Sequence, residues 1–365
     1  MKDFIFRNDT KLLFRNDIRN TVAEISGGHK VMFVYGGGSV YRNGCHDDIV
    51  EALGKAGIPF VEYGDSSREL CKIQEGIRQA KANGVTMIIG AGGASVMDSA
   101  KLMAFGFYHE DTLWDYVKGR DPYGLQRLPI ALIPTYPSSG SENGLGAVSV
   151  DSRTGDYGTA YGIAADYALL CPKYSLTLDR KMTAYTGLVT LVQLSACILG
   201  DRNRMSYDAG ILYIRNVLQA TRTLMENPDD LDARGVIMLG ASLSTSSRMG
   251  IGKEETYAYD IYELEFLPEK LFGSSYRRSL TSVFPRFLKA MGRHHGEDIR
   301  KYYMDAFGYD KSIEESSKEL TTLFESFGVD MYFDGDITRK QVDSVPCHTE
   351  LSADEVFDMM QSLVR

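Results

Sequence analysis

Residues 85–101 constrain the fold of this chain more than any other stretch. The apolar run 85–89 leads into Gly90-Ala91-Gly92-Gly93, and a helical pattern follows at once. Glycines let a backbone approach a diphosphate closely, and the N–H groups at the start of a helix attract an anion. The order of strand, glycine turn and helix therefore predicts a phosphate-binding βα unit, and a nucleotide is the first ligand to consider.

The composition limits the classes of partner that the chain can bind. Its 365 residues are 44% hydrophobic and 24% charged, which is ordinary for a globular protein of two domains. The formal net charge of -9 argues against binding to nucleic acid or to an anionic membrane surface, because both require a basic face. No apolar run reaches the roughly 20 residues of a membrane span. We therefore expect a cytoplasmic protein that binds a small molecule, with neither a nucleic-acid nor a membrane partner.

The cysteines predict no disulfide framework and no zinc knuckle. They are odd in number, widely spaced and never arranged as Cys-x-x-Cys, which is typical of reduced thiols. The five are Cys45, Cys71, Cys171, Cys197 and Cys347.

Short apolar runs alternate with helical patterns through the first half of the chain. Strands are expected at residues 31–35, 60–63, 86–89, 130–134 and 167–171, with a hairpin at 147–151 and 157–163. Helices are expected at residues 45–56 and 66–83 and from residue 94 onward. Such a βαβ series predicts a Rossmann-like α/β domain with a mostly parallel sheet over residues 1–175.

Beyond Pro172 the strand pattern stops and helical periodicity takes over. Helices are expected at residues 183–201, 207–225, 233–247, 280–291, 313–327 and 352–363. Ser352 is placed to cap the last of them. The sequence therefore predicts a boundary at residues 172–179 and an all-α domain over residues 176–365.

Three short motifs rich in glycine and serine follow one another along the chain. The first is Tyr35-Gly36-Gly37-Gly38-Ser39 followed by Asn43-Gly44, the second is residues 92–98 with Lys101, and the third is Pro137-Ser138-Ser139-Gly140-Ser141-Glu142. Together they resemble the iron-containing (group III) alcohol dehydrogenase superfamily, in particular its NADP-dependent aldehyde reductase and butanol dehydrogenase branch. The resemblance covers nearly the whole chain. It implies the dehydroquinate synthase-like fold of that superfamily, an alcohol or aldehyde substrate, and a homodimer.

The resemblance also implies which residues contact the cofactor. They are Gly36, Gly37, Gly38, Ser39, Gly92, Gly93, Ala94, Ser95, Asp98, Thr135, Ser138, Ser139 and Ser141. The first motif carries no acidic residue to repel a 2′-phosphate, so NADP(H) is expected ahead of NAD(H). Ala94 replaces a family glycine, and its methyl group would crowd the diphosphate unless Gly92 and Gly93 make the contact. The third motif adds hydroxyl groups around a flexible Gly140. The alternatives are a tight turn for the first motif, an ordinary acidic residue in the first helical turn for Asp98 of the second, and a solvated loop for the third.

The superfamily holds iron or zinc with one aspartate and three histidines. The matching positions here are Thr190, Leu194, Ala258 and Tyr276. These are not ligands for such metals. Between residues 30 and 292 the only histidines are His46 and His109, and His294 and His295 sit in a loop pattern with rings expected to point apart. The sequence therefore predicts no iron or zinc site.

The remaining catalytic candidates are tyrosines. The position of the family's proton-relay histidine falls on Tyr262, and Tyr276 lies at a former ligand position. A tyrosine with a pKa of ~10 becomes a better acid when a cation lies nearby, and Lys253, Arg277 and Arg278 are the candidates. Alternatively, the tyrosines only fill the vacated space.

Three functions stay open on the sequence. One is a metal-free NADPH-dependent carbonyl reductase or alcohol dehydrogenase. Another is a catalytically silent nucleotide-binding protein, acting as a sensor or as the partner of an active paralogue. The third is a metal-dependent dehydrogenase with unrecognised ligands.

Overall fold

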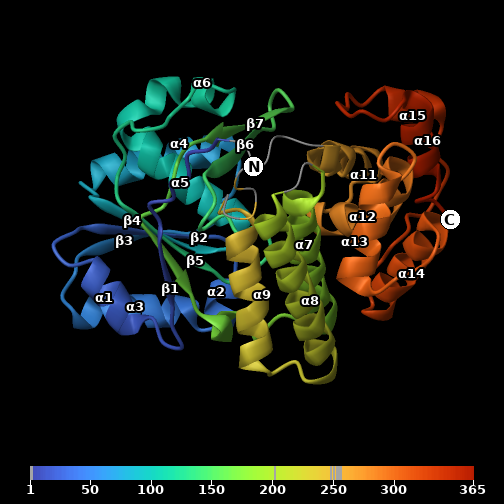
Figure 1. Cartoon of the computed structure of the whole chain (residues 1–365). Coiled ribbons are helices and arrows are strands. Elements are labelled where there is room, and N and C mark those ends of the chain that lie inside the picture. The colour runs from blue at the N-terminus through green and yellow to red at the C-terminus, as the bar shows by residue number, and fades with distance from the viewer. Residues whose placement is uncertain (1–2, 201–202, 247–248, 250, 252–256) are drawn as a thin grey trace. The chain divides into compact units, whose positions relative to one another are not determined.

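The computed structural model describes residues 3–200, 203–246, 249, 251 and 257–365 (Figure 1). It divides into two compact units. The α/β unit comprises Arg7–Leu178 and Ala241–Ser247, and the helical unit comprises Met1–Phe6, Asp179–Gly240 and Arg248–Arg365. Among the described residues, no helix combines the length and apolar character needed to span a membrane.

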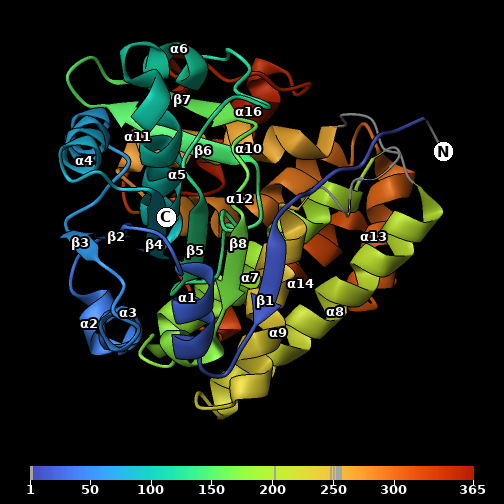
Figure 2. The ribbon, with the colours of Figure 1, turned by 90° about the vertical axis from the view of Figure 1, so that its left-hand side faces the viewer.

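A six-stranded sheet forms the centre of the α/β unit, in the order β1-β8-β5-β4-β2-β3 (Figure 2). The strands are β1 (Lys11–Phe14), β2 (Val31–Tyr35), β3 (Phe60–Tyr63), β4 (Met87–Gly92), β5 (Ile130–Pro134) and β8 (Tyr167–Leu170). Every pairing in this sheet is parallel, which confirms the predicted α/β class. The edge strand β1 was not predicted.

The sheet is buried on both faces because alternate residues of each strand point to opposite sides. Met32 and Val34 of β2 pack with α4 and α5, whereas Val31 and Phe33 pack with α1 and α3. The helices on the two faces are seen in Figure 1. They are α1 (Arg19–Ile25) and α3 (Cys45–Lys55) on one face and α4 (Leu70–Ala82) and α5 (Ala94–His109) on the other.

Smaller elements complete the α/β unit. They are α2 (Ser39–Arg42), η1 (Glu110–Thr112), α6 (Leu113–Val117), the antiparallel pair β6 (Gly146–Asp151) and β7 (Asp156–Tyr161), and η2 (Pro172–Ser175). The β6–β7 pair is the predicted hairpin. All five cysteines are free thiols, as expected.

The helical unit is built around α7 (Arg180–Ile198), which is buried at every position from Thr183 to Ile198. A Cβ on Gly187 would lie 1.9 Å from Thr221 Oγ1, so glycine permits the close packing of α7 against α8. The other helices are α8 (Arg204–Glu226), α9 (Leu231–Ser244), η3 (Tyr257–Tyr259), α10 (Asp260–Leu264), α11 (Phe266–Phe272), α12 (Tyr276–Met291), α13 (Gly296–Phe307), α14 (Ile313–Ser326), α15 (Arg339–Asp343) and α16 (Ala353–Gln361).

Helix boundaries agree with the long predicted helices to within a few residues. Ser352 caps α16 through a capping box with Glu355, as the sequence indicated. In the part of the helical unit that the structure describes, extended pairing is limited to one bridge between Phe333 and Val364. The all-helical prediction for this half is therefore confirmed, with the helices α10, α11, α13 and α15 added.

Candidate functional site

Three loops leave the carboxyl ends of neighbouring parallel strands in the α/β unit. Loop 1 (residues 36–39) follows β2, loop 2 (residues 92–95) follows β4, and loop 3 (residues 135–144) follows β5. Tyr35 pairs with Ala91 in the sheet, and the amide of Thr135 donates to the carbonyl of Gly92 at 2.9 Å. The chain reverses its direction across the sheet at β2, with β3 on one side and β4 on the other. Ligands of open α/β sheets bind at such a switch point.

Loop 2 has the geometry of an anion cradle. A Cβ on Gly92 would lie 2.9 Å from the Cβ of Val96, so only glycine lets the strand turn this closely into α5. Gly93 occupies the N-cap of α5 with φ -84° and ψ -176° and provides no side-chain cap. A Cβ there would meet nothing closer than Tyr136, at 3.9 Å. The first-turn N–H groups of a helix lack intrahelical acceptors and favour an anion.

Asp98 is held by groups from two other segments. Its side chain is buried, and its Oδ2 accepts from Arg68 Nε at 3.0 Å and Nη2 at 2.9 Å. The hydroxyl of Ser141 donates to Oδ1 at 2.5 Å, and the amide of Arg68 donates to Ser95 Oγ at 3.1 Å. Arg68 thus links Ser95 to Asp98, and Ser141 joins these two predicted cofactor residues through its bond to Asp98. The sequence analysis missed Arg68 because it lies 30 positions from Asp98 and belongs to no motif.

Loop 1 is the most exposed of the three. A Cβ on Gly36 would lie 3.1 Å from Val96 Cγ2, which seats the start of the loop against α5. A Cβ on Gly38 would lie 3.2 Å from Arg42 Nη1. The residues exposed to solvent are Gly37, Gly38 and Ser39.

A cation accompanies loop 1 that the sequence analysis did not single out. Arg42 ends α2, and no carboxylate of the described residues lies within ion-pair distance of its guanidinium. The signal available in the sequence was that Arg42 follows Gly38 by four positions, which is about one helical turn. An unneutralised guanidinium beside an exposed glycine loop favours a phosphate group.

Loop 3 is closely packed around Gly140, the position that was expected to be flexible. The residue has φ +64°, and a Cβ there would lie 2.1 Å from the carbonyl oxygen of Ala241. Thr245 Oγ1 donates to the Gly140 carbonyl at 2.7 Å. The predicted contact residues Thr135, Ser138 and Ser141 are all buried, and Ser139 is half-buried.

A buried lysine anchors the far end of loop 3. Lys101 of α5 is fully buried, and its Nζ donates to the carbonyls of Gly144 at 2.8 Å and Gly146 at 2.9 Å. Burial lowers the pKa of Lys101 to about 8, although Asp98 and Glu142 act in the opposite direction. Burial also raises the pKa of Glu142. Lys101 thereby ties α5 to the start of the β6–β7 hairpin.

The positions that match the family's metal ligands lie in the helical unit. They are Thr190, Leu194, Ala258 and Tyr276. Thr190 donates its hydroxyl to the carbonyl of Thr186 at 2.8 Å, and Leu194 and Ala258 are buried in the apolar core. The hydroxyl of Tyr276 accepts from Gln193 Nε2 at 3.3 Å. Hydroxyl and hydrocarbon groups do not fit iron or zinc, and the described residues contain no cluster of three His, Cys, Asp or Glu side chains that could hold a metal ion.

The two adjacent histidines do not converge on one point. His294 Nε2 lies 3.0 Å from Glu355 Oε1, whereas His295 contacts Glu350. The centroids of the two rings are 6.5 Å apart. Both residues lie in the turn between α12 and α13, in agreement with the sequence interpretation.

Tyr262 lies among groups that make it a weaker acid. Burial raises its pKa well above the usual value, and the neighbouring Tyr276 and Cys197 raise it further. Of the expected cations, Arg277 lies 6.0 Å from the ring centroid of Tyr185.

The second expected cation is likewise engaged elsewhere. Arg278 donates to the carbonyl of Tyr332 at 2.5 Å and lies 4.4 Å from the ring centroid of Phe333. Lys253, the third, falls outside the described residues. Activation of Tyr262 by Arg277 or Arg278 therefore finds no support in the geometry.

Comparisons with known proteins give one consistent result. The family model "Iron-containing alcohol dehydrogenase" matches residues 9–177. NADH-dependent butanol dehydrogenase B of Clostridium acetobutylicum is 28% identical over 275 residues, which are 73% of this chain and 70% of the relative. The NADPH-dependent aldehyde reductase YqhD of Escherichia coli is 24% identical, over 90% of this chain and 88% of the relative.

Solved structures agree on the fold. The crystal structure of NADH-dependent butanol dehydrogenase A from Thermotoga maritima superimposes with a TM-score of 0.89 at 24% identity, covering 100% of this chain and 99% of that one. At this identity the likeness establishes the fold, and it confirms the predicted arrangement of a parallel-sheet half and a helical half.

Proposed function

Because the chain belongs to the iron-containing alcohol dehydrogenase superfamily, we propose that it binds a nicotinamide dinucleotide at loops 1–3 and exchanges hydride with a small alcohol or aldehyde without iron or zinc. The observation that carries the binding proposal is the convergence of three loops at the switch point of the sheet. The first-turn N–H groups of α5 would hold the diphosphate, and Gly93 leaves room for it. From the resemblance we also expect a cytoplasmic homodimer.

The transfer of the hydride and the transfer of the proton require different groups. When bound, the dinucleotide supplies or accepts the hydride. The carbonyl oxygen must also gain a proton, and Tyr262 and Tyr276 are the proposed donors in place of the family's metal and histidine. Neither role requires a ligand at Thr190, Leu194 or Ala258.

One observation favours a second function, a catalytically silent nucleotide-binding protein. The pKa of Tyr262 is raised by burial and by its neighbours, which weakens it as a proton donor. A protein of this kind would keep the cofactor site and lose turnover.

Elemental analysis and turnover separate these functions. We expect less than a tenth of an equivalent of iron or zinc in protein purified without chelator, and binding of NADP⁺ by isothermal titration. Reduction of short aldehydes by NADPH should persist in EDTA and disappear in Tyr262→Phe or Tyr276→Phe, but not in Tyr213→Phe on exposed surface of α8. Binding without turnover would select the silent protein. Near-stoichiometric metal would restore a metal-dependent dehydrogenase.

Arg42 is expected to set the preference for NADP(H). In Arg42→Gln the dissociation constant for NADPH should rise about tenfold or more, because a charge-assisted bond to the 2′-phosphate is lost. Binding of NADH should change little, since it carries no phosphate there. Titration calorimetry with both cofactors tests this, with the exposed Arg78→Gln on α4 as the control. Equal losses for both cofactors would contradict the assignment.

A further inference from the structure

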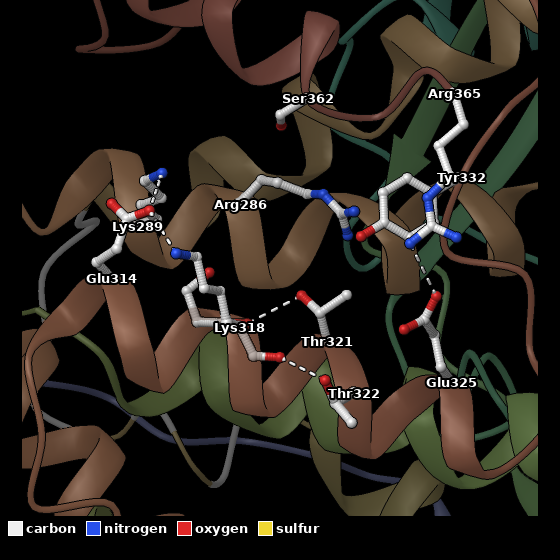
Figure 3. A pocket seen from close by; sticks show the side chains of 11 residues that line it. Arg286, Lys289, Glu314, Lys318, Thr321, Thr322, Glu325, Tyr332, Ser362 and Arg365 are labelled. Carbon is white, nitrogen blue, oxygen red and sulfur yellow. Dashed lines mark hydrogen bonds and ion pairs between the residues drawn. The ribbon is translucent and has the colours of Figure 1, made fainter.

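A cavity of about 320 Å³ lies wholly within the helical unit (Figure 3). Helices α12 and α14 form its sides, and residues 332, 362 and 365 contribute the rest of the wall. Its charged side chains are Arg286, Lys289, Lys318, Arg365, Glu314 and Glu325. Four cations face two carboxylates, although the chain as a whole carries a net charge of -9. The positive excess is therefore a local feature of this cavity.

Arg286 is the most confined of these cations. Its side chain is 8% exposed, and its Nη1 donates to the carbonyl of Ser282 on its own helix at 2.9 Å. Within the described part of the chain, no carboxylate lies at ion-pair distance from this guanidinium. Burial lowers the pKa of Arg286, although Tyr332 and Glu325 act in the opposite direction. A buried charge without a counter-ion is costly, and a bound anion would offset that cost.

A second guanidinium lies against the same aromatic ring. The guanidinium carbons of Arg286 and Arg365 are 4.6 Å and 3.3 Å from the ring centroid of Tyr332 (Figure 3). Glu325 Oε1 is 3.5 Å from Arg365 Nη2, and the side chains of Arg365 and Glu325 are 63% and 37% exposed. Water weakens this pair, and one carboxylate beside two guanidinium groups leaves a net positive charge.

The other end of the cavity adds two ammonium groups that share one carboxylate (Figure 3). Glu314 Oε1 lies 2.8 Å from Lys289 Nζ and 3.6 Å from Lys318 Nζ. The hydroxyls of Ser317 and Thr321 donate to main-chain carbonyls at 2.7 Å and 2.9 Å. Because those hydroxyl protons are engaged, the donors left for a ligand are the cationic groups and the hydroxyl of Tyr332.

We propose that this cavity binds a phosphorylated small molecule, whose phosphoryl oxygens accept hydrogen bonds from Arg286, Arg365 and the two lysines. The planar fork of arginine matches phosphate geometry, and lysine adds point charge. The volume lies at the lower end of the roughly 300–1,000 Å³ of small-molecule sites. A compact phosphate ester fits this space better than a dinucleotide. The proposal does not depend on the function proposed above.

Titration with inorganic pyrophosphate at constant ionic strength tests the site. The probe variant is Lys289→Gln/Lys318→Gln, and the control is Lys55→Gln/Lys81→Gln, which removes two exposed lysines that also pair with glutamates. The dissociation constant should rise about tenfold or more in the probe variant and stay unchanged in the control. If pyrophosphate binds only at the glycine loops, its dissociation constant will be the same in the probe and control variants. That result would overturn the proposal. So would the absence of binding to the wild-type protein.

The melting temperature of Arg286→Met is an independent test. It separates a ligand-binding arginine from one with a purely structural role. In buffer without phosphate, the melting temperature of the variant should be at least that of the wild type, because a buried unpaired charge is replaced by an apolar side chain. Pyrophosphate should raise the melting temperature of the wild type by more than that of the variant, which keeps only the part of the response that comes from the glycine loops. A variant that keeps the wild-type response would overturn the proposal.

Discussion

Gly93→Ala is expected to weaken dinucleotide binding about a hundredfold while the protein still folds. The added methyl group meets nothing closer than 3.9 Å, and φ -84° with ψ -176° is open to any residue. The same methyl group would stand where a diphosphate approaches the first-turn N–H groups of α5. Losing two hydrogen bonds to a charged group costs about 3 kcal/mol, which is about a hundredfold in affinity. Titration calorimetry with NADPH and a thermal unfolding curve measure the two halves of the prediction.

Two further variants serve as controls for Gly93→Ala. Gly54→Ala places its Cβ in open space within α3, so it should raise the free energy of unfolding by about 0.5–1 kcal/mol without changing the affinity. Ala94→Gly removes the methyl group that departs from the family pattern and should strengthen binding. An unchanged affinity in Gly93→Ala would exclude loop 2 as the diphosphate site.

The sheet was predictable because its inner strands carry their signal locally. β2 and β4 are buried on both faces, so each reads as an uninterrupted apolar run that stops at glycine. Strand β1 escaped prediction because it lies at the edge, where only Leu12 and Leu13 are even partly buried. The three loops lie at the same edge because every pairing in the observed sheet is parallel.

The interior of the site was not predictable in the same way. Arg68 reaches Asp98 from 30 positions away, and Thr245 fixes Gly140 from 105 positions away. No local pattern encodes such pairs, so the sequence alone indicates only a glycine within a serine-rich loop.

The helical half shows the same limit. Helices α10 and α15 have five residues each, too few to display a period of 3.6. Arg286 and Arg365 of the cationic cavity are far apart in the sequence and come together only in the folded chain. Neither belongs to a motif.

Lys101 is expected to make the α/β unit more stable as pH rises from about 8 to about 10.5. Its pKa is about 8 in the folded protein, below the 10.5 of an ordinary lysine. Below pH 8 both states hold the proton, so pH has no effect through this group. Between the two pKa values the folded state has lost the proton that the unfolded state still binds, so the free energy of unfolding rises with pH. The full gain is about 3 kcal/mol at ~1.4 kcal/mol for each pH unit.

The gain is measured as a difference against Lys101→Met, because other groups that titrate in alkali affect both proteins alike. Urea unfolding at pH 7 to 10, followed by the fluorescence of the chain's only tryptophan, Trp114 in α6, reports on the α/β unit. The stability gap should widen toward alkaline pH, whereas Lys55→Met, at an exposed position, should show a constant gap. Neutral Lys101 still donates to Gly144 and Gly146, so the anchor of loop 3 survives the loss of charge. If the difference in free energy of unfolding between the wild type and Lys101→Met narrows as pH rises, the charged form of Lys101 is the stabilising one.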